Sequence, residues 1–237
     1  MRHKRYLGSM PPPGSATGPT PHAPEPAPGP ARHEWSTRHS VLTLARRTVA
    51  LLNALSPEEP QPETVAAVLC EYGEPAPVRL STADVADLRL AAEELRAVFE
   101  ATDVDLAASR LNRLLARGTG ALRLSSHHGE SPWHPHLDSD DEAPWGEWLL
   151  ASSCLALTVL VWDRQEPPGG VCASPVCRHV FITRGSGPDR RYCSRRCATR
   201  ERVAAHRRNR AAAGIGPRGE ERVTPRRGAG SSGPPAP

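Results

Sequence analysis

Apolar residues recur every three to four positions between residues 38 and 118, which is the spacing of amphipathic helices. Ser56-Pro57, Gly73 and Gly118 follow these apolar runs as end signals, and Ser81 or Thr82 can cap the start of one of them. The pattern predicts a mostly helical domain. Its four expected helices begin and end at these residues: Arg38 to Leu55, Glu63 to Tyr72, Ser81 or Thr82 to Phe99, and Val104 to Gly118.

The spacing changes after residue 120. Ala121–Ser125 and Trp133–Leu137 are short runs typical of strands, and the turn-prone segment 126–132 between them predicts a β-hairpin. An apolar helix is expected at Trp145–Trp162, and Pro167-Pro168-Gly169-Gly170 is expected to form a linker after it. The helical domain should therefore span residues 36–165.

The two ends of the chain have little material for a core. Pro and Gly total 45 residues and gather in the first 34 and the last two dozen or so positions, so we expect disordered tails at 1–35 and 211–237. The longest apolar stretch, 149–162, is too short to span a bilayer, and no secretory signal follows Met1. We therefore expect a cytoplasmic protein without a membrane partner, in which clustered cysteines favour metal over disulfides.

Four of the six cysteines form two close pairs near the C-terminal end. The first pair has the spacing C-x4-C, 15 residues follow, and the second pair has the spacing C-x3-C. Four thiolates satisfy the tetrahedral preference of Zn²⁺ and leave no position for water, which predicts one structural Zn²⁺ rather than a catalytic one. A redox pair is the alternative, and His179 and His206 are alternative ligands. The expected ligands are Cys172, Cys177, Cys193 and Cys197.

The residues around these cysteines predict a small zinc finger at 171–210. His179–Thr183 can form a strand and Gly185–Pro188 a hairpin-like loop. Ser194 can cap a helix over Arg195–Ala211. A knuckle, a β-hairpin and a helix that carries the last ligand form a treble-clef-like finger.

Charge is distributed unevenly along the chain. Residues 1–170 carry a net charge of −7, whereas residues 171–237 carry +11 from 15 arginines and four acids. Guanidinium groups match phosphate oxygens, so this basic segment favours nucleic acid. A solvated helix, or one that docks on an acidic protein, is the alternative. The candidate nucleic-acid-binding residues are Arg190, Arg191, Arg195, Arg196, Arg200, Arg202, Arg207, Arg208 and Arg210.

Several segments resemble a known family. Cys172-Ala-Ser-Pro-Val-Cys177, Arg190-Arg191-Tyr192-Cys193-Ser194 and Cys197-Ala-Thr-Arg200 are similar to the CGNR zinc finger of bacterial proteins, although Ala198 and Thr199 replace the signature Gly and Asn. Members typically carry an N-terminal ABATE domain and are described as stress-induced transcription regulators. Arg110-Leu-Asn112, Leu122-Arg-Leu124 and Trp133-His134-Pro135-His136 resemble that domain. The resemblance implies DNA binding and transcription regulation.

Histidines form the one constellation in the helical domain that could carry chemistry. His134 and His136 alternate along a strand and therefore point the same way, so they could share a metal or an anionic ligand. His127 and His128, which lie upstream, belong to the same constellation. The alternative is a strand edge whose imidazoles hydrogen-bond locally. Oxygen ligands could come from a downstream acidic run, Asp138, Asp140, Asp141 and Glu142.

Three classes of function remain open. The first is a zinc-finger transcription regulator that binds DNA, with RNA as the alternative target, and whose helical domain senses a small-molecule or protein effector. The second is a zinc-dependent protein-interaction module. The third is a metal-dependent enzyme that uses the Trp-His-Pro-His strand. We expect no enzyme, because no activated nucleophile, phosphate loop or carboxylate pair has a persuasive spacing.

Overall fold

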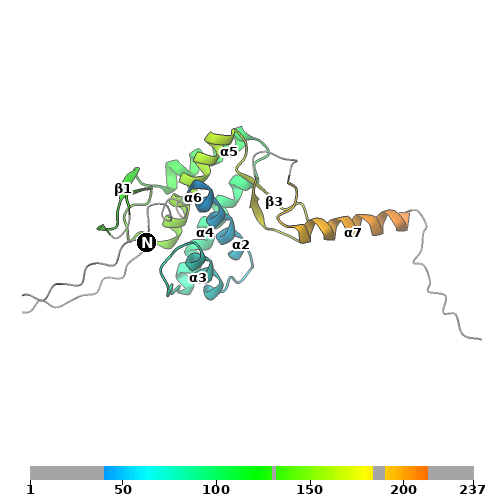
Figure 1. Cartoon of the computed structure of the whole chain (residues 1–237), viewed down its shortest axis with the longest axis horizontal. Helices are drawn as coiled ribbons and strands as arrows, with labels where there is room; N and C mark the ends of the chain where they lie inside the picture. Colours follow the sequence, from blue (N-terminus) through cyan, green and yellow to red (C-terminus); the bar gives the residue numbers. More distant parts are fainter. Residues whose placement is uncertain (1–39, 130–131, 184–189, 213–237) are drawn as a thin grey trace, which may run out of the picture. The chain divides into compact units, whose positions relative to one another are not determined.

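A computed structural model describes residues 40–129, 132–183 and 190–212 of the chain (Figure 1). The expected loop at 185–188 and nearly all of the two expected tails lie outside the described residues. The chain divides into two compact units, the second of which begins at Thr199, and each is considered by itself. The described elements are α2 (Val41–Ala54), α3 (Pro62–Glu71), α4 (Thr82–Phe99), α5 (Val104–Gly118), β1 (Arg123–Ser125), β2 (His134–His136), α6 (Trp145–Arg164), β3 (Gly169–Val171), β4 (Val180–Ile182) and α7 (Arg195–Ala212).

The predicted helices are present, and side-chain caps explain where three of them begin. Ser40 accepts a hydrogen bond from the backbone of α2, and Asp103 does the same at the start of α5. Ser81 caps α4 in a reciprocal capping box with Asp84. The mostly helical fold predicted for this part of the chain is confirmed.

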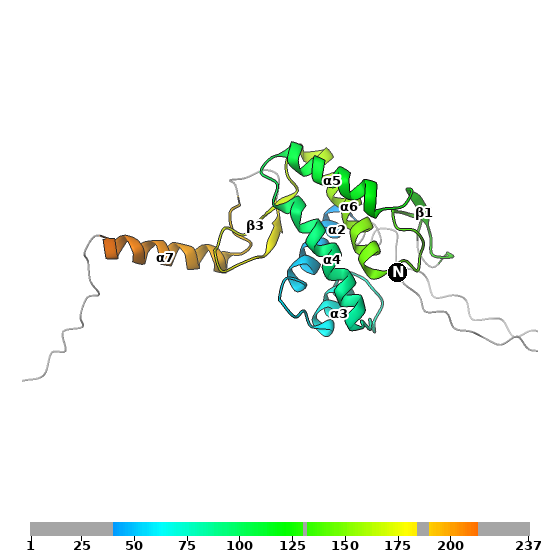
Figure 2. The ribbon, with the colours of Figure 1, turned by 180° about the vertical axis from the view of Figure 1, so that it is seen from behind.

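Helix α6 forms the centre of the core. It packs against α2, α4 and α5 (Figures 1 and 2), and Leu149 and Leu157 are fully buried. In the described part of the chain, α6 alone is long and apolar enough to cross a membrane by length and composition. About 61% of its most apolar window is buried inside the protein, which is the environment of a core helix.

The predicted hairpin after α5 is present as the antiparallel pair β1–β2. Arg123 lies opposite His136, and Ser125 lies opposite His134. Because side chains alternate along a strand, these four residues share one face of the hairpin. Leu124 is on the other face and is exposed.

The predicted linker at 167–170 is wrong in its second half. Gly169 and Gly170 belong to β3, which pairs antiparallel with β4. A Cβ atom at Gly169 would collide with the carbonyl oxygen of Phe181 and the ring of Phe99, so this close approach requires a glycine. The Pro-Pro-Gly-Gly composition indicated a flexible segment, whereas the two glycines serve close packing between a strand and the core.

Strand β4 is fixed to the helical core through Asn53 of α2. The side-chain amide of Asn53 donates to the carbonyl of Val180 at 3.1 Å, and its side-chain oxygen accepts from the Val180 N–H at 2.8 Å. Val180 itself is 1% exposed and belongs to the core cluster. Strand β3 lies before the first cysteine pair and β4 lies after it. The hairpin that they form is therefore attached to the helical core.

We expect Asn53→Ala to lower the free energy of unfolding by roughly 1–3 kcal/mol, because the buried polar groups of Val180 lose both partners. Urea unfolding followed by circular dichroism measures the change. Asn112→Ala, which truncates an exposed asparagine on α5, is the matched control and should change stability by less than about 0.5 kcal/mol. Equal losses in the two variants would contradict the role of Asn53.

Candidate zinc centre and basic helix

The first cysteine pair lies in a knuckle that the backbone closes. The Cys172 N–H donates to His179 O at 2.9 Å, and the Cys177 N–H donates to Ser174 O at 2.9 Å. These bonds turn the chain back between β3 and β4, so that both thiols lie on one side of the turn. The hairpin thus brackets the first knuckle.

The second pair approaches the first through a further backbone contact. The Ala173 N–H donates to Arg191 O at 2.8 Å, which brings the segment before Cys193 beside the first knuckle. Ser194 accepts a hydrogen bond from the Cys197 N–H at 3.3 Å and so caps α7, as predicted. The last ligand therefore lies in the first turn of the helix.

All four predicted cysteines converge, with their Sγ atoms within 4.8 Å of one another. Cys193 Sγ lies 3.6 Å from Cys177 Sγ and 3.7 Å from Cys197 Sγ. Four sulfurs at the usual Zn–S length of about 2.3 Å stand about 3.8 Å apart in a tetrahedron. The cluster thus has the ligand type, number and spacing to hold one zinc ion. His179 is exposed and is not part of it.

The protonation of these thiols makes zinc binding depend on pH. Burial, reinforced by the neighbouring thiols, raises the pKa of Cys193 to about 12. A hydrogen bond with Ser194 lowers the pKa of Cys197 to about 7. A dication at the centre would deprotonate coordinating thiols, so zinc binding releases protons and weakens as the pH falls.

A known family covers this part of the chain. Residues 170–210 match the CGNR zinc finger. The matched segment contains all four converging cysteines and most of α7. No curated protein matches the chain. The CGNR finger predicted from the sequence is thereby confirmed for this segment, with Ala198 and Thr199 at two of its signature positions.

Two of the nine predicted arginines lie before α7, and one of them supports the finger itself. The Arg190 guanidinium lies 4.8 Å from the centre of the Phe181 ring and donates to Tyr192 O at 2.8 Å. It also donates to Cys193 O. Arg190 therefore holds the second knuckle in place. Arg191 is exposed.

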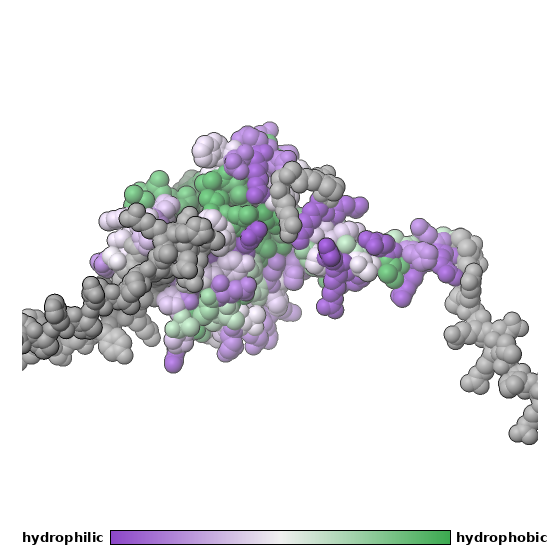
Figure 3. All heavy atoms as spheres, in the orientation of Figure 1, coloured by the Kyte–Doolittle hydropathy of each residue, from purple (hydrophilic) through white to green (hydrophobic). Residues whose placement is uncertain are grey.

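The other seven arginines belong to α7, whose only buried residue is Cys197. Arg210 is half-buried, and the remaining six are exposed. Figure 3 shows hydrophilic residues along this helix. Arg196, Arg200 and Arg207 follow one another at intervals of four and seven positions, so they line one face of the helix, called the arginine stripe below.

The predicted ligand pair His134 and His136 is joined by a third histidine. His127, in the turn after β1, has its ligand atom within 4.8 Å of theirs. His127 was one of the four candidate histidines but not one of the expected ligand pair, because it lies in a turn rather than on the strand whose alternation predicted that pair. His128 is exposed and stays outside this group, called the histidine cluster below.

Two of the four acidic residues predicted as oxygen ligands lie next to the histidine cluster but do not face its centre. Asp138 and Asp141 contact the Nδ1 atoms of His136 and His127 rather than the centre of the cluster. Burial alone would raise the pKa of Asp141, but hydrogen bonds from Arg123 and Ser125 lower it to about 2. Burial lowers the pKa of His127 to about 4. The carboxylate is therefore ionised and the imidazole neutral near pH 7.

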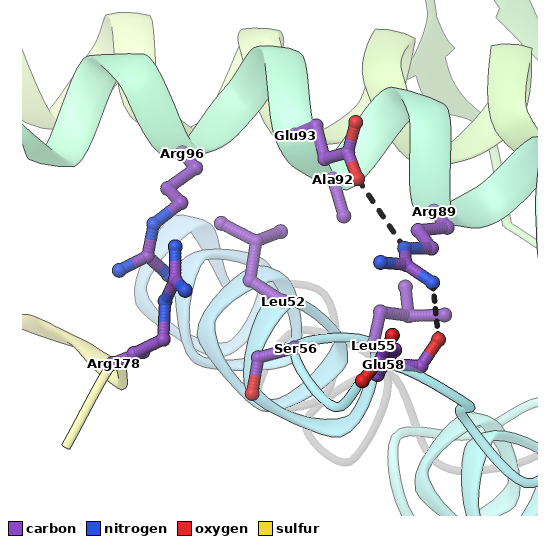
Figure 4. A pocket seen from close by; sticks show the side chains of 9 residues that line it. All are labelled: Leu52, Leu55, Ser56, Glu58, Arg89, Ala92, Glu93, Arg96 and Arg178. Carbon is purple, nitrogen blue, oxygen red and sulfur yellow. Dashed lines mark hydrogen bonds and ion pairs between the residues drawn. The ribbon is translucent and has the colours of Figure 1, made fainter. Parts of the chain in front are cut away.

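A separate pocket lies between α2, α4 and the first knuckle (Figure 4). The side chains of Arg96 and Arg178 lie next to each other at one end, while Arg89 pairs with Glu93 at 3.3 Å at the other. Arg96 also pairs with Glu100 at 3.2 Å. The lining residues of the pocket are Leu52, Leu55, Ser56, Glu58, Arg89, Ala92, Glu93, Arg96 and Arg178.

Proposed function

We propose that this chain is a zinc-finger transcription regulator that binds DNA through the arginines of α7. The observation that carries the proposal is the arginine stripe on a helix whose first turn holds a zinc ligand. A zinc ion at the four cysteines would fix the start of α7 and leave the stripe exposed. Exposed guanidiniums at helical spacing can then neutralise successive phosphates along a nucleic acid.

The composition of α7 supports nucleic acid over a protein partner. The helix carries seven arginines and a single acid, Glu201, and Val203 is its one exposed large apolar side chain. Protein interfaces depend on buried apolar or aromatic anchors, which this surface offers sparsely. The second candidate is a protein-interaction module, since the positive charges of α7 would also attract an acidic peptide.

The helical domain would supply the regulatory part of the function. Its resemblance to the ABATE domain and its sensing of an effector stay predictions, and the pocket beside Arg178 is the place where a small anion would contact both α4 and the first knuckle. That the chain acts by binding rather than as an enzyme also stays a prediction.

Salt dependence tests the proposal. Full-length, zinc-loaded protein is titrated against fluorescent duplex DNA and single-stranded RNA of equal length at several salt concentrations, with anisotropy as the readout. If four to six phosphates are neutralised, log Kd for DNA should rise with log salt with a slope of about 4–5. Absence of salt-dependent binding to either nucleic acid would contradict the proposal, and salt-insensitive peptide capture would favour the interaction module.

A further inference from the structure

The three side chains of the histidine cluster point their Nε2 atoms at a common centre. His134 Nε2 lies 3.2 Å from His127 Nε2 and 2.9 Å from His136 Nε2. His134 and His136 come from β2, and His127 comes from the turn that follows β1. Residues 127 and 134 meet because Ser125 and His134 are paired in the hairpin register.

The other ring nitrogen of each histidine faces an oxygen acceptor. His136 Nδ1 lies 2.9 Å from an oxygen of Asp138, and His127 Nδ1 lies 3.3 Å from an oxygen of Asp141. His134 Nδ1 lies 2.8 Å from the carbonyl oxygen of Pro132. A neutral imidazole has one N–H, and an oxygen acceptor beside Nδ1 favours the tautomer that carries the proton there. In that tautomer the Nε2 lone pairs of all three rings face one another.

Three lone pairs at this separation repel unless a cation lies between them. Three nitrogens at the usual Zn–N length of about 2.0–2.1 Å stand about 3.3 Å apart around a tetrahedral ion. The observed separations of 2.9 and 3.2 Å are close to that value. Metal-bound histidines also commonly donate Nδ1–H to a carboxylate or a backbone carbonyl, and the Nδ1 atoms here lie next to such oxygens: a carboxylate for His136 and His127, and a carbonyl for His134.

A salt-bridge network holds the two carboxylates behind the imidazoles. Arg123 of β1 donates to Asp138 at 2.7 Å and to Asp141 at 2.8 Å. Ser125 donates to the second oxygen of Asp141 at 2.9 Å. Asp138 is 4% exposed, as is His127. One guanidinium fork thus orients the acceptors of two of the three rings.

The turn that carries His127 has an unusual backbone. His127 and His128 have φ values of 49° and 58°, and Gly129 has 89°, so three consecutive residues are left-handed. Non-glycine residues in this region cost of order 1–3 kcal/mol each and persist where surrounding contacts enforce them. Here the His127 N–H is bound by Ser125 Oγ at 3.1 Å, which turns the ring toward the cluster.

We propose that His127, His134 and His136 bind a divalent first-row transition metal ion through their Nε2 atoms. Imidazole nitrogen suits zinc, cobalt, nickel and copper, and three such ligands leave a tetrahedral ion one position for water or an exogenous ligand. This second metal site is built from other residues and another ligand type than the cysteine cluster, and it does not depend on nucleic-acid binding.

Zinc is the probe for the test. Full-length protein is saturated with Zn²⁺, freed of excess ion by gel filtration and analysed for metal. Wild type should carry two zinc ions per chain, and His134→Ala should carry one. His128→Ala, which removes the neighbouring exposed imidazole, is the matched control and should retain two. Two ions in His134→Ala, or a single ion in wild type, would overturn the proposal.

A thiol-modifying reagent separates the two sites without a mutation. It should release one zinc ion from the wild-type protein, while the second remains until a chelator is added, because imidazole ligands do not react. Release of all zinc by the reagent alone would overturn the proposal. Asp138→Asn keeps the three imidazoles and should weaken binding of the second ion by about 10–100-fold. This variant tests the proposal if His134→Ala fails to fold.

Discussion

Cys193→Ser is expected to lose the zinc ion of the cysteine cluster and the fold around it. Cys193 Sγ lies 3.6 Å from Cys177 Sγ and 3.7 Å from Cys197 Sγ, so its removal opens the tetrahedron. Structural zinc contributes roughly 10–16 kcal/mol to the folding of small fingers, and the two knuckles have little apolar surface to replace it. Metal analysis should show one zinc ion fewer per chain than in wild type.

Hydrogen exchange shows how far the unfolding extends. The knuckle amides and the start of α7 should lose protection in Cys193→Ser, whereas β4 should keep it because Asn53 and the core hold Val180 independently of zinc. Cys70→Ser replaces a cysteine outside the cluster and is the matched control. Full zinc content in Cys193→Ser would contradict the four-cysteine site.

The second prediction with a large expected effect concerns the affinity of α7 for DNA. Replacing Arg196, Arg200, Arg207 and Arg208 together by glutamine keeps helix propensity and removes four exposed charges. Binding to duplex DNA should weaken by at least ~10²-fold at low salt, and the salt slope should fall by about 3.6 if all four contacts are lost, because each lost phosphate contact removes about 0.9 from it. Anisotropy titrations of wild type and variant, side by side, measure both quantities.

A control with the same change in net charge separates local contacts from overall attraction. It replaces four exposed arginines outside α7, Arg46, Arg79, Arg113 and Arg117, by glutamine. Its affinity at 0.1 M salt should fall by less than about tenfold, and by less than that of the α7 variant at every salt concentration, because general attraction is screened beyond the Debye length of about 10 Å at 0.1 M salt. Equal losses in the two variants would mean that α7 has no special role.

The helices and the zinc cluster could be predicted because their signals are local. Apolar spacing located α2, α4, α5 and α6 within a few residues, since each buries one face or, for α6, most of its surface. The cysteine pairs were recognisable because each knuckle needs only a few residues between its ligands. Ser194 was identified as a cap because α7 starts immediately after it.

The features that sequence reasoning missed depend on contacts between distant segments. His127 joins the histidine cluster only because the hairpin register places it beside β2, and a left-handed turn gives no periodic signal. The role of Asn53 depends on a strand 127 residues away. Gly169 and Gly170 indicated a linker because nothing in their composition reveals the ring of Phe99 beside Gly169 or the ring of Phe181 beside Gly170.

The two hydrogen bonds between Asn53 and Val180 limit how the finger can be separated from the rest of the chain. A peptide cut at residues 170–210 would keep all four cysteines but would expose Val180 and Phe181, which are 1% and 4% exposed in the whole chain. It would also leave the N–H and C=O of Val180 on the edge of β4 without the Asn53 side chain, and unpaired strand edges are a common start of aggregation. Transplanting the finger onto another protein therefore requires a host helix that offers an asparagine, or an equivalent, at the same place.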